Sequence, residues 1–359
     1  MGQKETSKRP ETDAVPPLCR VTLLWSWSFQ AGATNLNQTT ISTAADASSP
    51  LLSILRCPRC RSQLSLGWGH VSCLNEKCIY SDQEFPLLNG QPVLIDFADS
   101  IFERSNYKTG NGSALPRDLT RNKFRSRLRL LVNGTNPVAA KNCDLFLSLV
   151  KAETEYPRIL IIGGGDVGLG ADRLYSDSGI ELIGTDVYVS PCTALLCDAH
   201  KLPFETQTFD GIWIQAVLEH VLDPHVVVAE IHRVLKHNGY VYAETPFMQQ
   251  VHERAYDFSR FTRSGHRWLF GRFEEIRSGS ITGPAIAFLW SMRYLLRALG
   301  AGEKISRAIV LLFSWIRFLD CFCLPQKSSD AAGGVFFLGR RSETKISAAS
   351  MVRYYDQQS

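Results

Sequence analysis

The stretch of sequence that decides the fold is Ile159–Gly168, which reads ILIIGGGDVG. Four apolar residues run directly into three glycines, which is typical of a buried strand that turns tightly into a helix. Glycine permits positive φ and lets backbone amides approach a ligand at a helix N-terminus. The run also fits the dinucleotide fingerprint, with Asp186 about twenty residues further on. By itself it predicts a nucleotide-type cofactor site and does not distinguish NAD from S-adenosylmethionine.

Around this turn, from about residue 136 onward, short apolar runs alternate with helical patterns, which predicts a parallel sheet wrapped by helices. A helix is expected over 136–152, ahead of the first strand. A second is expected over 224–236, with Asp223 as N-cap, and Asn238-Gly239 should end it. The expected strands cover 158–162, 180–185, 194–197, 209–215, 240–244, 273–277 and 334–338.

The composition of the whole chain is that of a globular protein. Of its 359 residues, 45% are hydrophobic and 21% charged, which excludes a collagen-like or wholly disordered chain. The net charge of 39 − 35 = +4 is too small to indicate a nucleic-acid partner by itself. No uncharged apolar run reaches the roughly 18 residues of a membrane helix, and the N-terminus is a poor signal peptide. We therefore expect a cytoplasmic protein, with a peripheral membrane contact as the alternative.

Composition divides the chain into five segments. The expected segments are a disordered leader (1–50), a cysteine unit (51–98), a basic connector (99–135), an α/β domain (136–345) with a hydrophobic insert (281–334), and a tail (346–359). The basic residues of the connector are Arg117, Arg121, Lys123, Arg125, Arg127 and Arg129. This cluster, at 117–129, could neutralise phosphates of lipid or RNA, although a solvated helix face explains it more simply.

The cysteine unit has the spacing of a zinc site. Cys57-x2-Cys60 is followed by twelve residues and then by Cys73-x4-Cys78. Two close cysteine pairs separated by a short hairpin are how a chain builds a tetrahedral thiolate site. A unit of about 50 residues gains folding free energy from a metal, so we predict a structural Zn²⁺ bound by all four cysteines. The alternative is disulfides or free thiols, and nothing marks the chain as secreted.

The same unit resembles the small zinc-ribbon proteins that partner tRNA and protein methyltransferases. The resemblance lies in Cys57-Pro58-Arg59-Cys60, the second cysteine pair, Phe85-Pro86 and Asn89–Ile95. Such ribbons also occur fused ahead of bacterial methyltransferase domains. The resemblance implies a protein or RNA contact through the ribbon.

The residues beyond the glycine turn resemble, in order and spacing, the class I S-adenosylmethionine-dependent methyltransferases of the type 11 group. The matching segments are Asp198–Phe204, Thr208–Asp210, Val217–Pro224 and Glu230–Gly239. The resemblance covers roughly residues 155–280. It implies a Rossmann-like, seven-stranded sheet and S-adenosylmethionine as the cofactor.

The resemblance also implies where the cofactor lies. The residues that would contact it are Gly163, Gly165, Asp166, Gly168, Asp186, Asp198, Ala199 and Gln215. The glycines would face its methionine and ribose part, Asp186 its ribose hydroxyls and Asp198 its adenine. Each aspartate could alternatively serve as a simple turn residue, but both follow a predicted strand at the expected place. The family often has an acid where this chain has Ile161, so Asp166 or backbone carbonyls would bind the methionine amine.

The acceptor side is expected in the loop after the fifth strand, residues 244–262. It mixes aromatic with ionisable side chains, and methyl transfer depends mainly on positioning. If the acceptor must lose a proton, the candidate catalytic residues are His252, Asp257 and His220. The histidines of this region lack a tight ligand spacing, so we expect them to cap or pack rather than to form a second metal site.

The insert contains two amphipathic patterns with wide apolar faces, over 284–299 and 304–322. Through 281–322 it could contact a membrane surface or form a hydrophobic acceptor pocket. A helical cap on the sheet, or the interface of a homo-oligomer, is the plainer interpretation.

The resulting prediction is an S-adenosylmethionine-dependent methyltransferase with an unidentified acceptor. The ribbon favours RNA or protein as the acceptor, whereas the insert favours a lipid-linked, glycan or apolar small molecule. We expect an acceptor of the second kind, a lipid-linked, glycan or apolar small molecule. An NAD(P)-binding oxidoreductase would need the same glycine turn but would not explain Leu218–Pro224. A catalytically inactive scaffold that acts through its ribbon would fit the missing acid at Ile161.

Overall fold

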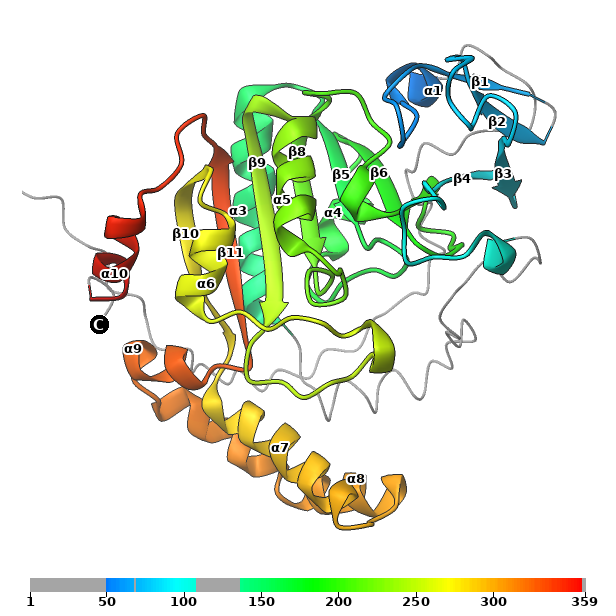
Figure 1. Ribbon diagram of the computed structural model, residues 1–359. Coiled ribbons are helices and arrows are strands. Elements are labelled where there is room, and N and C mark those ends of the chain that lie inside the picture. The colour runs from blue at the N-terminus through cyan, green and yellow to red at the C-terminus, as the bar shows by residue number, and fades with distance from the viewer. Residues whose placement is uncertain (1–49, 68, 108–135, 357–359) are drawn as a thin grey trace, which may run out of the picture.

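The computed structural model describes residues 50–67, 69–107 and 136–356 (Figure 1). The expected leader, apart from Pro50, and the basic cluster at 117–129 lie outside these residues.

A seven-stranded sheet forms the centre of the α/β part. Its strands are β5 (Arg158–Ile162), β6 (Glu181–Asp186), β7 (Leu195–Cys197), β8 (Phe209–Gln215), β9 (Leu235–Pro246), β10 (Phe273–Thr282) and β11 (Gly334–Arg341). They are arranged in the order β7-β6-β5-β8-β9-β11-β10. Strands β7, β6, β5, β8 and β9 are parallel to one another, whereas β11 is antiparallel to both of its neighbours. The expected fold class is confirmed, because every predicted strand is present.

Alternating residues of the central strands face two helical layers. Leu160 and Ile162 belong to one core cluster, and Ile159 and Ile161 belong to the other. Helices α5 and α6 pack on the first face, and α3 and α4 pack on the second (Figure 1). The bounds of these helices are Pro137–Glu153 for α3, Asp172–Ser176 for α4, Pro224–Val234 for α5 and Arg263–Leu269 for α6. Both faces of the sheet are therefore buried, as its continuous apolar runs require.

Helix α5 begins as predicted but ends earlier than predicted. The Asp223 side chain accepts hydrogen bonds from the first-turn amides, so it is the N-cap. The helix stops at Val234, and Leu235 is already extended and paired in register with Phe209. Asn238-Gly239 lies inside β9 rather than at a helix end. The prediction was wrong because the buried Leu235 joins the sheet before the polar dipeptide is reached.

The cysteine unit extends the sheet at its β7 edge. It contains α1 (Pro50–Ile54), β1 (Leu64–Leu66), β2 (His70–Cys73), β3 (Phe85–Leu88) and β4 (Gln91–Leu94). Strand β4 pairs in parallel with β7, with Val93 opposite Leu196, so the continuous sheet has eleven strands among the described residues. Leu51, Leu55 and Phe85 share one hydrophobic core with residues of the α/β part. The unit is therefore built into the domain rather than tethered to it.

The insert projects from the body of the molecule between β10 and β11 (Figure 1). It comprises α7 (Pro284–Ala298), α8 (Glu303–Leu312), the 3-10 helix η4 (Ser314–Phe322), α9 (Pro325–Ser328) and η5 (Ser329–Ala331). We call 284–322 the apolar hairpin. Its expected second helix is divided at Phe313 into α8 and η4. Among the described residues, no helix combines the length and apolar character needed to cross a bilayer.

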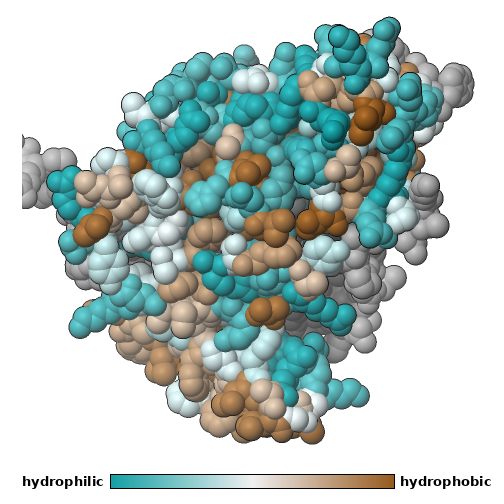
Figure 2. Space-filling view, viewed as in Figure 1, coloured by the Kyte–Doolittle hydropathy of each residue, from teal (hydrophilic) through white to brown (hydrophobic). Residues whose placement is uncertain are grey.

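Many large side chains of the apolar hairpin are solvent-exposed, and they form the brown area at the bottom of Figure 2. The most exposed are Phe322 at 82%, Leu299 at 76% and Leu312 at 74%. Three arginines of the hairpin, Arg293, Arg297 and Arg307, pair with its Glu303.

The remaining elements are short. They are η1 (Arg104–Tyr107), η2 (Ala199–Lys201), η3 (Arg254–Tyr256) and the C-terminal α10 (Ala348–Asp356).

Candidate active site

The glycine turn after β5 is packed too closely to hold larger residues. Gly163 has a φ of +77°, and a Cβ placed there would lie 2.1 Å from a methyl group of Val217. A Cβ on Gly165 would lie 2.1 Å from the Tyr188 hydroxyl, and the Gly164 amide donates to the Thr185 carbonyl at 2.8 Å. The turn is therefore fixed against the ends of β6 and β8, and the missing side chains leave its backbone open to a ligand.

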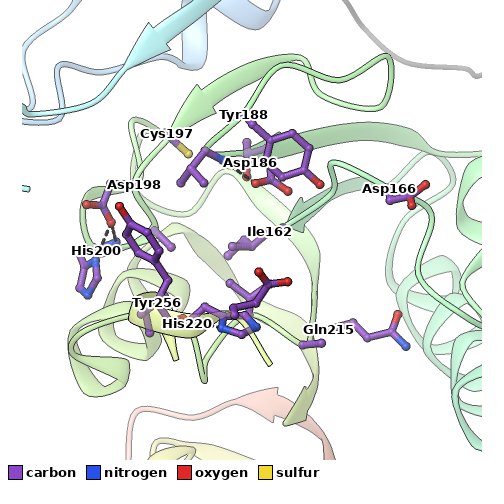
Figure 3. Close-up of a pocket in the computed structure, with 18 of the residues that line it drawn as sticks. Ile162, Asp166, Asp186, Tyr188, Cys197, Asp198, His200, Gln215, His220 and Tyr256 are labelled. Atoms are coloured by element: carbon purple, nitrogen blue, oxygen red, sulfur yellow. Dashed lines mark hydrogen bonds and ion pairs between the residues drawn. The ribbon is translucent and has the colours of Figure 1, made fainter. Parts of the chain in front are cut away.

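Asp186 ends β6 beside this turn. One carboxylate oxygen accepts the Gly165 amide at 2.8 Å, and the other accepts the Val187 amide at 2.7 Å. The carboxylate lines the main cavity together with Tyr188 (Figure 3). A carboxylate oxygen can accept more than one hydrogen bond, so a ligand hydroxyl can bind here as well.

Asp198 follows β7 and is almost completely buried. Ser100 donates its hydroxyl to Oδ2 at 2.6 Å, and His200 contacts Oδ1 through its ring Nδ1 at 2.6 Å and its amide at 3.0 Å. The far nitrogen of His200 accepts the Asp223 amide at 3.0 Å, so Nδ1 carries the proton. Burial raises the pKa of Asp198, but the hydrogen bonds from His200 and Ser100 together outweigh burial and lower the pKa. The carboxylate is therefore charged and fixed in place.

These groups surround a cavity of about 380 Å³ (Figure 3). The predicted site residues that line it are Gly163, Asp166, Gly168, Asp186, Asp198, Ala199, Gln215, His220 and His252. Gly165 and Asp257 do not line it. Gly165 lies behind Tyr188, and Asp257 lies behind His252. The cavity has the size of a small-molecule site.

Several lining residues were missed by the sequence analysis. Ile101 and Phe102 come from the segment after the cysteine unit, and Tyr256 comes from η3. The Phe102 and Tyr256 rings are nearly parallel, with centroids 6.3 Å apart, so the two segments meet over the cavity. Neither segment has a periodic pattern that would predict a place at the cavity. Only the aromatic residues in the loop after β9 indicated a binding site there.

A buried polar network adjoins the glycine turn. Gln215 donates to Glu244 at 2.8 Å and to the Leu169 carbonyl at 3.1 Å, while Asn136 and Tyr242 also donate to Glu244. Burial raises the pKa of Glu244 to about 7. Ile161 belongs to the core cluster on the α3 side of the sheet, so Asp166 is the acid of this turn that lines the cavity.

The acceptor-side histidines lie together although they are 32 residues apart in the sequence. The ring centroids of His220 and His252 are 4.9 Å apart, and both side chains line the cavity. His220 Nδ1 lies 2.7 Å from the Tyr256 carbonyl. Beneath them Glu219 is 1% exposed, and its burial raises its pKa to about 8. The sequence analysis did not single out Glu219.

Asp257 supports this loop from behind. Burial raises its pKa, but the hydrogen bonds and charge of Arg260 and the hydrogen bond from the His252 amide together outweigh burial and lower the pKa to about 2. The carboxylate also accepts the His252 amide at 2.8 Å and lies 3.3 Å from His252 Nδ1. Asp257 is thus permanently charged and orients His252.

The acceptor loop also contacts the apolar hairpin. Tyr294 of α7 donates its hydroxyl to the Val251 carbonyl at 2.6 Å, and Gln250 donates to Ser291 at 2.8 Å. A second cavity of about 510 Å³ lies between the loop and Tyr294. The hairpin is therefore connected to the loop that carries His252.

The four cysteines converge as a metal site requires. Their sulfur atoms all lie within 4.8 Å of one another, with 3.8 Å between those of Cys57 and Cys78 and 3.4 Å between those of Cys60 and Cys73. Sulfur atoms bound to one tetrahedral zinc ion lie about 3.8 Å apart, given Zn–S bonds of about 2.3 Å. The donor set and its spacing fit a structural Zn²⁺.

Comparison with known proteins supports the interpretation of the α/β part. Residues 166–243 match the family model of the methyltransferase domain. The chain matches no curated protein.

Solved structures give a weaker likeness. A Haemonchus contortus phosphoethanolamine N-methyltransferase 2 has 18% identity and a TM-score of 0.38, and the match covers 63% of this chain and 60% of that one. A Streptomyces coelicolor geranyl diphosphate C-methyltransferase has 14% identity and a TM-score of 0.37, with 56% and 76% covered. A chain from the complex of the Haloferax volcanii Trm112 methyltransferase activator has 18% identity and a TM-score of 0.35, with 62% and 100% covered. This chain spans less than two thirds of the first of these relatives.

The strand order and the domain match together define the fold. The reversed β11 lies between β9 and β10, and the matched residues begin in the glycine turn and end in β9. The chain therefore contains a class I methyltransferase domain, and a four-cysteine unit compatible with a zinc ribbon extends the sheet of that domain at one edge.

Proposed function

We propose that this protein transfers a methyl group from S-adenosylmethionine to an apolar or lipid-linked acceptor. The observation that carries the proposal is the cavity, which joins the glycine turn, both strand-end aspartates and the acceptor-side histidines in one space. S-adenosylmethionine supplies an electrophilic methyl group on a sulfonium centre.

The residues that line the cavity fit this cofactor. Asp186 lines the cavity, where its carboxylate would accept hydrogen bonds from the ribose hydroxyls, and Asp198 and Ala199 line the part that we assign to the adenine. Asp166 and the backbone of Gly163 are left for the methionine part. The bare glycine backbone and the fixed, charged Asp198 provide the preorganisation that such binding needs.

The sheet argues against the oxidoreductase alternative. A dinucleotide-binding fold continues its parallel order with a sixth parallel strand. Here the strand after β9 in the sheet is β11, which runs antiparallel. The inactive-scaffold alternative is weakened by Asp166, which is present at the cavity although Ile161 replaces the acid of the family.

The acceptor proposal rests on the link between the apolar hairpin and the loop of His252. A lipid-linked or apolar acceptor bound along the hairpin would be delivered to the histidine side of the cavity. His252, oriented by Asp257, and His220 are the groups placed to contact the acceptor and to hold its proton if one must leave. A contact of the hairpin with a membrane surface belongs to the same proposal.

The experiment has two parts, both on the full-length protein. Calorimetry compares binding of S-adenosylhomocysteine with binding of NADH, and we expect only the first to bind. Cell fractions are then incubated with methyl-labelled S-adenosylmethionine, and we expect label in the lipid-extractable fraction. Binding of NADH alone would overturn the cofactor assignment. Label confined to RNA, protein or polar metabolites would overturn the acceptor assignment.

A further inference from the structure

We propose that Glu219, His220 and His252 form a binding site for a first-row divalent cation at the acceptor end of the cavity. Glu219 and His220 follow β8, and His252 lies in the loop after β9. One ligand atom from each residue lies within 4.8 Å of the others. Two imidazoles and one carboxylate are a common donor set for zinc, iron(II), cobalt and related ions.

The first histidine has its metal-binding nitrogen free. His220 Nδ1 lies 2.7 Å from the Tyr256 carbonyl, which can only accept, so Nδ1 carries the proton. Nε2 is then left with a lone pair, and it lies 3.6 Å from Glu219 Oε1. A backbone carbonyl that fixes the tautomer in this way is typical of metal-binding histidines.

The second histidine is arranged in the same way. His252 Nδ1 lies 3.3 Å from the Gln250 carbonyl and 3.3 Å from the Asp257 carboxylate, and His252 Nε2 lies 3.9 Å from Glu219 Oε1. Asp257 is itself held by Arg260 and by the His252 amide. A carboxylate behind a histidine orients the ring and makes it a better ligand.

The carboxylate provides an independent observation. Glu219 is 1% exposed, and its Oε2 has no hydrogen-bond partner among the described residues. A buried carboxylate without a partner is costly, so most such groups are paired or bind a metal. A cation between the two Nε2 atoms and Glu219 Oε1 would compensate the charge of this buried carboxylate.

The distances fit a metal centre after a small adjustment. Bonds of about 2.0–2.2 Å place the ligand atoms of a tetrahedral ion roughly 3.3–3.5 Å apart. The observed separations are 3.6 Å and 3.9 Å. Three protein ligands leave coordination positions open, as in catalytic rather than structural sites.

The open positions would face the cavity, since both histidines line it. They would take an oxygen donor of the acceptor, such as a hydroxyl or carboxylate, and the cation would position that group and lower the pKa of a hydroxyl. The role of the cation in binding the acceptor rests on the proposed methyl transfer, whereas the cation site itself does not.

The test uses the full-length protein with its cysteine unit already loaded with zinc. Titration with Co²⁺ is followed by visible absorption, and the same titration with Mn²⁺ is followed by electron paramagnetic resonance. We expect one further equivalent to bind without thiolate charge-transfer bands. Glu219→Gln and His252→Asn should each weaken Kd at least tenfold, and Asp257→Asn should weaken it about 10- to 100-fold. His237→Asn, which removes an exposed histidine paired with Glu343, is the matched control and should change nothing.

The proposal is overturned if neither ion binds at millimolar concentration, or if Kd is unchanged in Glu219→Gln and His252→Asn. Circular dichroism checks that the variants fold. If Glu219→Gln does not fold, His252→Asn decides, because its side chain is partly exposed on a loop. Binding of S-adenosylhomocysteine is measured on the same samples. If the protein binds the cation but not S-adenosylhomocysteine, the proposed function is refuted and the proposed cation site stands.

Discussion

Asp198 shows how single residues connect distant parts of this chain. Its carboxylate is held by Ser100, which follows the cysteine unit, and by His200, which in turn binds the amide of Asp223. The predicted adenine acid is thus tied both to the ribbon side and to the start of α5. Its position depends on three segments rather than on β7 alone.

The first prediction at this scale concerns Asp186. Asp186→Asn should raise the Kd for S-adenosylhomocysteine about 10- to 100-fold, because a charge-assisted hydrogen bond to the ribose is lost. Calorimetry checks this. Asp144→Asn, which removes an exposed carboxylate paired with Arg173, is the matched control and should bind normally. Equal affinities would mean that Asp186 only shapes the turn.

The second prediction concerns pH. The pKa of Glu244 is raised to about 7 by burial from its ordinary 4.5, so the folded state holds a proton that the unfolded state has lost between these values. Its contribution to stability is therefore complete below about pH 4.5 and falls as pH rises to about 7, by up to roughly 3 kcal/mol. Glu244→Gln should remove this fall. Urea unfolding from pH 4.5 to 8 measures the free energy of unfolding of both proteins. If this free energy changes with pH equally in the unchanged protein and in Glu244→Gln, the prediction is contradicted.

Sequence reasoning reached some of these residues and missed others for a physical reason. Asp186 and Asp198 directly follow apolar strands, and a strand end is visible in the sequence. Ser100, Phe102 and Tyr256 lie in segments without a period, and only docking of the ribbon and the acceptor loop brings them to the cavity. Gly165 was predicted to contact the cofactor and Asp257 was a catalytic candidate; neither lines the cavity of about 380 Å³, and they contact Tyr188 and His252.

At the scale of elements, strands were easier to predict than their boundaries. Strands β5 and β8 have the predicted limits, and most residues of each are buried. Strand β9 starts five residues early, because Leu235 pairs with Phe209. The amphipathic pattern over 304–322 continues without a break, and no sequence signal shows that the chain changes from α8 to η4 at Phe313.

The third prediction concerns the apolar hairpin. The double change Leu312→Ser and Phe322→Ser should lower binding to phosphatidylcholine–phosphatidylserine vesicles at least tenfold, since each apolar side chain buried contributes about 1.5–3 kcal/mol. Vesicle co-sedimentation measures this. Val352→Ser removes a similarly exposed apolar residue, 73% exposed on α10, and serves as the control. Unchanged vesicle binding would show that the hairpin does not contact the bilayer.

At the scale of the whole molecule, the ribbon and the methyltransferase domain share one structure. Gln91 donates to the Ser190 and Thr193 carbonyls, Arg61 pairs with Glu230, and Lys201 pairs with Asp96. These contacts accompany the pairing of β4 with β7. The sequence indicated both parts, but nothing in it indicated that they would form one sheet.

The fourth prediction follows from this continuity. Cys60→Ser should destabilise the ribbon and lower the melting temperature by about 5 °C or more, because metal binding is part of its folding free energy. It should also weaken S-adenosylhomocysteine binding severalfold, since Ser100 would no longer hold Asp198. Thermal unfolding and calorimetry test the two effects. Cys323→Ser, which changes a cysteine in the insert, should show neither effect.

The pairing of β4 with β7 within one chain also fixes the stoichiometry of the assembly. Two separate proteins that met through such an edge would separate on dilution and would have to be produced in matched amounts. A covalent connection replaces that encounter with an effective concentration of about millimolar, whatever the amount of protein present. The proposed methyl transfer should therefore keep a constant rate per molecule down to nanomolar protein.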